Sequence, residues 1–260
     1  MISVLSLIIF LAVIAVLRDR DNSPKQSGQS TRNIGNTRKI GSIEHSSSAS
    51  RSQVEDYNSR FRRWINSFNY DEDTELALKR RLLELGFKDT AVYHNLYIYL
   101  GNDCYSQVDI VVATEVGIIV IEDKNYGGWI FGNGMHEQWT QVMAYGSEKY
   151  RFYNPIKQNQ QHIKHLRELS EQLNNIPFYS IIVFSGNATL KQIDNIPPRT
   201  YVIYKSQLEK TIGQIIISNP HCIYKNKWEI VRLLSEAAKN GLNPMIVENH
   251  KRRVSQKYGS

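Results

Sequence analysis

Two apolar runs that carry acidic side chains place the strongest constraint on the fold of this chain. They occupy the stretch QVDIVVATEVGIIVIEDKNYGG, residues 107–128. Residues 108–113 and 118–121 are mostly β-branched and apolar, which predicts two strands that are buried on both faces. Asp109 lies within the first strand, and Glu122 directly follows the second. The fold therefore has to accommodate two carboxylates in a part of a sheet that is otherwise apolar.

The spacing of the charged residues predicts which of them face each other. Side chains alternate between the two faces of a strand, so Glu122 and Lys124 point to one side and Asp123 to the other. A two-residue hairpin loop at residues 115–116 would place Asp109 opposite Glu122, with Cβ atoms roughly 5 Å apart. A type I turn with a bulge would instead shift the pairing by one residue, and the two carboxylates would be diagonal neighbours at best.

Two carboxylates this close repel each other unless a positive charge lies between them. Mg²⁺ takes a small number of carboxylate oxygens and keeps waters and substrate phosphate oxygens as its other ligands. Lys124, on the same face as Glu122, is suited to assist an attacking water or to stabilise charge that develops on a phosphate. The spacing is equally compatible with a buried ion-pair cluster of Asp109, Glu122 and Lys124 that has no catalytic role.

A helix and a strand are expected before this stretch. Residues 74–86 have leucines at helical spacing and end at Gly86, which is typical of an amphipathic helix with a glycine C-terminal stop. Glu75 lies in the first turn, where a carboxylate also compensates the helix dipole. Residues 87–100 include the aromatic run YHNLYIYL, which predicts a strand.

A second helix is expected after it. Asn154 and Pro155 have the residue types of an N-cap and a first helical position, and the pattern continues to about Leu173. Gln158 falls in the first turn of this helix. Its amide is placed there either to face a phosphate or simply to face solvent.

Two pairs of side chains are weaker indications of a functional site. His162 and His165 are three residues apart on the second helix, a spacing that can chelate a metal, but no third ligand of zinc type follows nearby. Trp129 and Trp139 have rings that could stack on bases, although such rings more often fill a core.

The motifs in these segments resemble the nuclease-related domain (NERD) family, which is placed among the PD-(D/E)xK nucleases. The resemblance runs from about residue 74 to about residue 208, roughly half of the chain. The landmarks occur in the family's order: Glu75 in the first helix, QVDIVV with Asp109, GIIVIEDKNYGGWIFG with Glu122 and Lys124, Trp139 with Gln141, and RFYNPIKQNQQHIKHL with Gln158. The family often has a Gly-Glu doublet in the first helix, where this chain has DEDTE, so Glu72 is an alternative to Glu75.

The resemblance implies a site and a reaction. Glu75, Asp109 and Glu122 would hold Mg²⁺ or Mn²⁺, Lys124 would assist the attacking water, and Gln158 would help to position water or phosphate. The implied activity is hydrolysis of a phosphodiester bond in DNA or RNA. The implied fold is α/β, with a restriction-endonuclease-like core in which helices flank a central mixed sheet.

The remaining pattern gives a domain organisation. Two further strands at residues 179–184 and 200–204 and two helices at 206–217 and 227–239 complete the α/β core. We expect the nuclease-related domain at residues 54–217, a C-terminal helix that packs on it at 218–242, and a flexible basic tail at 243–260.

The N-terminal end predicts attachment to a membrane. Residues 1–17, MISVLSLIIFLAVIAVL, are uncharged and span about 25 Å as a helix, at the short end for a transmembrane segment. A signal peptide is the alternative, but the basic n-region is missing. Residues 18–53 are rich in Ser, Asn, Gly and Arg, which predicts a disordered tether. Arg18 and Arg20 place the soluble part in the cytoplasm by the positive-inside rule.

Charge and cysteine content restrict the partners. The formal net charge of +7 suits a polyanion or an anionic lipid surface, and part of the excess lies in the tether and the tail. We expect nucleic acid as partner, DNA rather than RNA, together with the membrane, and no small-molecule cofactor. Two cysteines provide neither a disulfide framework nor a zinc spacing. A nucleic-acid-binding module or a membrane-associated interaction domain without turnover is the alternative to a nuclease.

Overall fold

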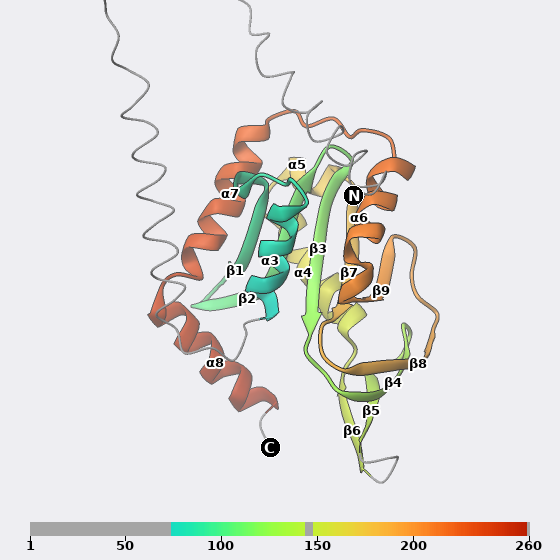
Figure 1. Cartoon of the computed structure of the whole chain (residues 1–260). Helices are drawn as coiled ribbons and strands as arrows, with labels where there is room; N and C mark the ends of the chain where they lie inside the picture. The colour runs from blue at the N-terminus through green and yellow to red at the C-terminus, as the bar shows by residue number, and fades with distance from the viewer. Residues whose placement is uncertain (1–73, 144–147, 259–260) are drawn as a thin grey trace, which may run out of the picture. The chain divides into compact units, whose positions relative to one another are not determined.

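The computed structural model of the chain describes residues 74–143 and 148–258 (Figure 1). The predicted anchor at residues 1–17, the tether at 18–53 and the alternative carboxylate Glu72 lie outside these residues. Within them, no helix combines the length and the apolar character that a membrane crossing needs.

The larger of two sheets contains the predicted hairpin. Its strand order is β1-β2-β3-β7-β9. The strands are β1 (Val92–Gly101), β2 (Cys104–Thr114), β3 (Gly117–Lys124), β7 (Phe178–Phe184) and β9 (Thr200–Tyr204). β1, β2 and β3 pair antiparallel, whereas β3 with β7 and β7 with β9 pair parallel. The predicted central mixed sheet is confirmed.

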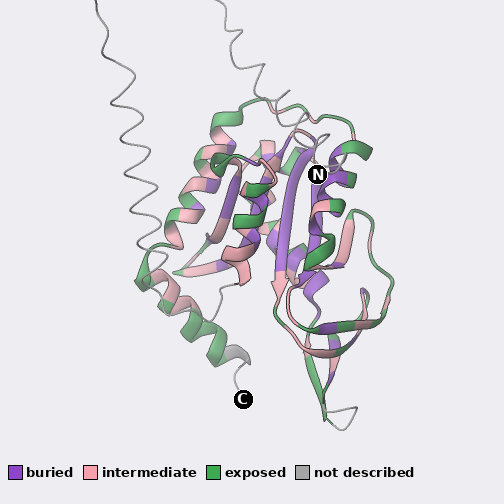
Figure 2. Cartoon of the chain, in the orientation of Figure 1, coloured by how far each residue is buried: buried purple, intermediate pink, exposed green. Residues whose placement is uncertain are grey.

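Helices cover both faces of this sheet. One face is covered by α3 (Thr74–Glu84) and α6 (Leu208–Ser218), and the other by α4 (Pro155–Glu168), α5 (Glu171–Asn175) and α7 (Lys227–Asn240). Short 3-10 helices at Asp89–Ala91 and Lys205–Gln207 join elements at the edges. β3 and β7 are almost entirely buried between the two layers (Figure 2). The expected α/β core is present, and α7 packs on it.

The first helix ends as its sequence predicts. Gly86 has a φ of 95°, a left-handed conformation that glycine adopts without strain. The amide of Gly86 donates to the Leu83 carbonyl at 3.0 Å, and that of Phe87 donates to the Leu82 carbonyl at 3.3 Å. This pair of hydrogen bonds is the Schellman arrangement that closes a helix C-terminus. It fixes the direction in which the chain leaves α3 toward β1.

The hairpin between β2 and β3 has the two-residue loop. Thr114 pairs with Gly117 and Ile110 with Ile121, without a register shift between them. The bulged alternative is therefore wrong. Asp109 and Glu122 are next in the same register, at the point where the pairing of the two strands ends.

A second, four-stranded sheet lies beyond the end of β3 in Figure 1. Its order is β6-β5-β4-β8, with β4 (Gly128–Asn133), β5 (Gln138–Met143), β6 (Glu148–Tyr153) and β8 (Ala188–Asp194). The sequence pattern predicted none of these four strands, and the run ATLKQID of β8 is largely polar. One face of this sheet packs on the core, where its Ile130 and Trp139 share a buried cluster with Phe184 of β7.

The second predicted helix is shorter than expected. α4 ends at Glu168 rather than near Leu173, and α5 begins after Ser170. The Ser170 hydroxyl accepts a hydrogen bond from the Leu173 amide at 3.2 Å. A serine that satisfies the backbone in this way starts a new helix instead of continuing the old one.

The predicted flexible tail is instead helical. α8 spans Pro244–Tyr258, and the Asn243 side chain accepts from the Met245 amide at 3.0 Å as its cap. The expectation was wrong because Asn243 and Pro244 form an N-cap and first-position pair, as Asn154 and Pro155 do at the start of α4. The His250 ring meets the Tyr97 ring edge-on at 5.3 Å, so α8 also packs on β1.

Candidate functional site

Two carboxylates meet where β2 and β3 separate. Asp109 Oδ2 accepts a hydrogen bond from the backbone amide of Asp123 at 2.8 Å. Glu122, one residue earlier on β3, is buried, with 1% of its surface exposed. The predicted proximity of Asp109 and Glu122 is thus produced by the hairpin register, and a side-chain-to-backbone bond replaces the next rung of the sheet.

Lys124 joins two of the predicted site residues. Its Nζ donates to Glu122 Oε1 at 2.6 Å and to Gln158 Oε1 at 3.1 Å. Glu122 and Lys124 lie on the same face of β3, as alternation predicts, and α4 brings Gln158 to them from 34 residues further along the chain. The ammonium therefore has a fixed position between a strand and a helix start.

His162 also belongs to this cluster of side chains, which the sequence pattern did not indicate. Its Nε2 lies 3.3 Å from Glu122 Oε2, and its Nδ1 lies 3.0 Å from the Ser106 hydroxyl. His162 follows Gln158 by one helical turn, so both face β3, and this i, i+4 spacing is the signal that could have found it. The contact with Glu122 does not have hydrogen-bond geometry, and both Glu122 Oε2 and His162 Nε2 remain without a bond.

Electrostatic interactions shift the pKa values of the two carboxylates in opposite directions. Burial alone would raise the pKa of Glu122, but the Lys124 ammonium and His162 outweigh it and hold this pKa below its ordinary value. Burial lowers the pKa of Lys124, whereas the Glu122 carboxylate raises it, and the balance leaves this pKa above its ordinary value. Glu122 and Lys124 are therefore a charged pair in the folded protein.

Asp109 has the opposite balance. Burial, followed by the charges of Glu122 and Glu75, raises the pKa of Asp109 well above its ordinary value. Lys124 and the bond from the Asp123 amide only partly offset this rise. Glu75, in the first turn of α3, is thereby placed within electrostatic range of the cluster. A positive charge near Asp109 would lower the free energy of its ionised form.

Asp123 points to the other face of β3 and belongs to a different contact. The Thr74 hydroxyl, at the start of the described part of α3, donates to Asp123 Oδ2. Burial raises the pKa of Asp123. This contact ties the turn that carries Glu75 to the end of β3.

Two buried asparagines position α4 over the site. Asn154 caps the helix by accepting from the Ile156 amide at 2.9 Å, and its amide nitrogen donates to the carbonyls of Asn133, Gly134 and His136. Asn159 donates to the Val120 carbonyl and the Ser180 hydroxyl, both at 2.9 Å. These bonds fix where Gln158 and His162 lie relative to β3.

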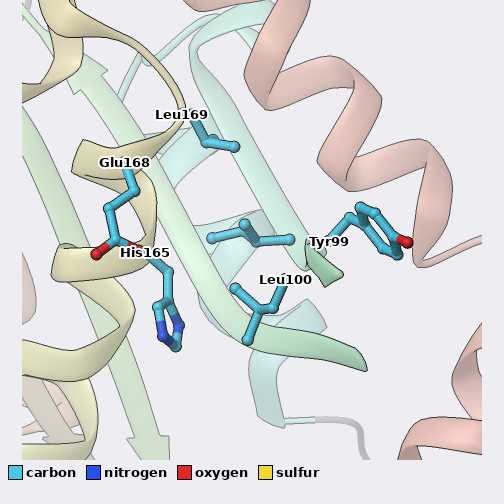
Figure 3. Close-up of a pocket in the computed structure, with 6 residues that line it drawn as sticks. Tyr99, Leu100, His165, Glu168 and Leu169 are labelled. Carbon is cyan, nitrogen blue, oxygen red and sulfur yellow. The ribbon is translucent and has the colours of Figure 1, made fainter. Parts of the chain in front are cut away.

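The other sequence candidates lie elsewhere. His165 does not join His162: its Nε2 lies 2.7 Å from the Gln161 amide nitrogen, and with Glu168 it lines a hollow toward Leu100 of β1 (Figure 3). Trp139 is buried and stacks on Phe184 with a centroid distance of 6.4 Å, so it is a core residue. Trp129 is 40% exposed.

The donor set fits a divalent cation of the magnesium type. In the described ranges, no three His, Cys, Asp or Glu side chains are close enough to enclose an ion by themselves. Mg²⁺ does not need such an enclosure, since one or two carboxylates suffice when waters and phosphate oxygens complete its shell. Asp109, with its raised pKa, and Glu122, with a buried oxygen that lacks a hydrogen bond, provide those two carboxylates.

Comparisons with known proteins agree with the motifs. Residues 71–185 match the family model described as "Nuclease-related domain". An uncharacterized protein of Bacillus anthracis is 36% identical over 138 residues, which cover 53% of this chain and 63% of that protein. The match thus spans less than two thirds of the relative's length. No solved structure matches the chain significantly.

Proposed function

We propose that the protein is a divalent-metal-dependent nuclease that hydrolyses phosphodiester bonds in nucleic acid, because residues 71–185 match the family model of the nuclease-related domain. The observation that carries the proposal is the convergence of Asp109, Glu122, Lys124 and Gln158 on one end of β3. The carboxylates provide sites for a cation, the ammonium provides a fixed positive charge, and the amide provides a neutral polar group beside it.

Lys124 is the residue we expect to act on the reacting atoms. Its Nζ makes two bonds to protein oxygens, to Glu122 and Gln158, and an ammonium has three donors. The third donor is available for a phosphate oxygen or for the attacking water. Because the ammonium is held in place before substrate arrives, its charge stabilises the transition state without a large reorganisation.

Asp109 and Glu122, with Glu75 nearby, would hold Mg²⁺ or Mn²⁺. When bound, the cation would supply Lewis-acid stabilisation of the charge that develops on the phosphate. Asp109 keeps the β3 end in place through the Asp123 amide, and Glu122 keeps the Lys124 ammonium oriented. His162 acts on Glu122 rather than on substrate, so it is a positioning residue.

A comparison of the wild-type protein with Lys124→Ala tests this proposal. We expect the wild type to cleave nucleic acid with Mn²⁺ or Mg²⁺ and not with EDTA, and the variant to lose about 100- to 1,000-fold in rate, as for loss of one transition-state donor. Linear, circular and single-stranded DNA and RNA should all be offered. Lys164→Ala, an exposed cation elsewhere on α4, is the matched control and should keep full activity.

Two results would contradict the proposal. Equal activity of the wild type and Lys124→Ala would remove the assigned site. No cleavage of any substrate by a folded wild-type protein, together with no effect of Mg²⁺ or Mn²⁺ on its melting temperature, would leave a binding module that keeps the fold without turnover.

A further inference from the structure

Exposed cations and aromatic rings share one face of the smaller sheet. On β6, Phe152 packs on Trp139 and Tyr126 in the core, so Lys149, Arg151 and Tyr153 alternate to the opposite side. All three of these side chains are exposed. This side of the sheet is called the outer face below.

The strand register extends the outer face across the sheet. Lys149 pairs with Val142 on β5, and Val142 pairs with Trp129 on β4, so the three positions form one row. Lys191, from the irregular part of β8, has its Nζ 4.8 Å from the centre of the Trp129 ring. A cation and an exposed aromatic ring are therefore held together at one point of the outer face.

The outer face has a positive charge balance. Within the described residues, Lys149, Arg151 and Lys191 form no ion pair. The one carboxylate on this side, Asp194, accepts from the Gln192 amide at 2.6 Å. Glu148 falls on the other side of β6. Three cations against one carboxylate favour an anionic partner.

The outer face also begins close to the candidate site. Trp129 follows Lys124 by five residues, so their Cα atoms are at most about 18 Å apart. Figure 1 shows the smaller sheet at the end of β3 that carries Lys124. A strand of nucleic acid that reaches Lys124 would have to extend only a few nucleotides to meet the Trp129 ring.

We propose that the outer face binds single-stranded nucleic acid, with bases stacked on Trp129 and Tyr153 and phosphates bound by Lys149, Arg151 and Lys191. Aromatic rings interspersed with cations are the chemistry of single-strand binding, because unpaired bases expose a face to stack, whereas a duplex hides it. The inference rests on the proposed function for its substrate, and it makes unpaired strands the preferred substrate class.

Binding of the full-length protein to labelled oligonucleotides tests the inference. The probes are a 20-nucleotide single-stranded DNA, the RNA of the same sequence and the corresponding DNA duplex, all in EDTA so that cleavage is absent. We expect the single strands to bind at least tenfold more tightly than the duplex. The DNA and RNA arms decide which sugar the outer face accepts.

Two sets of variants locate the binding. Trp129→Ala with Tyr153→Ala should weaken single-strand binding by about tenfold or more. Lys149→Gln, Arg151→Gln and Lys191→Gln together should also lower the salt dependence of single-strand binding by a slope of about 2. The matched controls are Tyr150→Ala, an exposed ring on the opposite side of β6, and a triple change of Lys164, Lys205 and Lys225 to glutamine.

The outcomes separate this inference from the proposed function. If the outer-face variants bind like the wild type, or if both triple variants weaken binding equally, the outer face is not the binding surface even when the wild type is an active nuclease. If binding is lost in the outer-face variants but the wild type cleaves nothing, the inference stands and the proposed nuclease activity fails. Preference for duplex over single strands overturns the substrate class.

Discussion

In the larger sheet the buried Glu122 and the partly buried Lys124 are bonded to each other, whereas in the smaller sheet Lys149 and Arg151 are exposed and unpaired among the described residues. The two sheets adjoin at the end of β3, so the difference does not come from distance along the chain. The difference in burial comes from the number of layers that cover each sheet. Helices cover both faces of the larger sheet, while one face of the smaller sheet packs on the core.

This difference teaches what each set of charges is able to do. A buried charge must be compensated by fixed partners, which gives it a defined position suited to chemistry. An exposed charge has many conformations and is screened by solvent, which suits a surface that accepts a flexible polyanion. Substitutions in the two sheets should therefore have effects of different size and kind.

The largest difference is expected for Glu122→Gln against Arg151→Gln. The Glu122 variant should lose about 100- to 10,000-fold in cleavage rate and about 3 kcal/mol in stability, because the Lys124 ammonium stays buried without its counter-charge. The Arg151 variant should keep its melting temperature. Cleavage assays and denaturant unfolding of both variants check this. Addition of Lys124→Met to Glu122→Gln should recover part of the stability, and no recovery would show that the two charges are not coupled.

Substitution of the two tryptophans of the smaller sheet compares the stability contributions of its two faces. Trp139 is fully packed against Phe184 and Phe152, so Trp139→Ala should cost about 3–5 kcal/mol of unfolding free energy. Trp129→Ala on the outer face should change it by less than about 1 kcal/mol. Thermal unfolding of the two variants measures both costs. Similar destabilisation by both would mean that the outer face is part of the core.

A smaller effect is expected for His162. His162→Ala should lower the cleavage rate by about 10- to 100-fold, as for other groups that orient a ligand residue. His162→Gln, which restores a polar group toward Glu122, should recover part of the rate. Separate measurement of kcat and KM is informative, since loss of a residue that positions Glu122 should lower kcat. A rate unchanged by either substitution would assign His162 to packing alone.

The smallest effect is a gain in stability. Asp109 has a folded-state pKa above its unfolded value, so its contribution to stability is present at low pH and is lost as pH rises through the folded pKa. Asp109→Asn removes this loss and keeps the bond from the Asp123 amide. We expect the variant to be more stable by about 1 kcal/mol at neutral pH in EDTA, with no gain near pH 4.

Metal gives the same variant a second readout. Mg²⁺ or Mn²⁺ should raise the melting temperature of the wild type and leave that of Asp109→Asn unchanged. Thermal melts at neutral and acidic pH, with EDTA or metal, provide all of these values. Destabilisation of the variant at neutral pH would contradict the repulsion between Asp109 and its neighbours, and a retained response to metal would contradict Asp109 as a metal ligand.

The sequence predicted the local parts of the site because each depends on near neighbours. The Thr114–Gly117 loop sets the register that places Asp109 beside Glu122, and alternation places Lys124 on the side of Glu122. Asn154 and Gly86 mark helix ends through hydrogen bonds within a few residues. The sequence pattern predicted neither the smaller sheet of β4, β5, β6 and β8 nor helix α8. The run of β8 lacks an apolar pattern, and α8 lies in a segment for which a flexible tail was expected.

The tertiary structure alone showed that His162 lies at the site and how Gln158, which the family resemblance named, reaches β3. The proximity of Asp109 and Glu122 follows from one of the two hairpin registers that the sequence allowed, and the structure has that register. Gln158 and His162 reach β3 only because three strands of a second sheet intervene and because Asn159 bonds α4 to β3 and β7. Which of two tryptophans is exposed depends likewise on which face of a sheet finds a core. Packing between segments far apart in sequence settles such questions, and no local pattern encodes them.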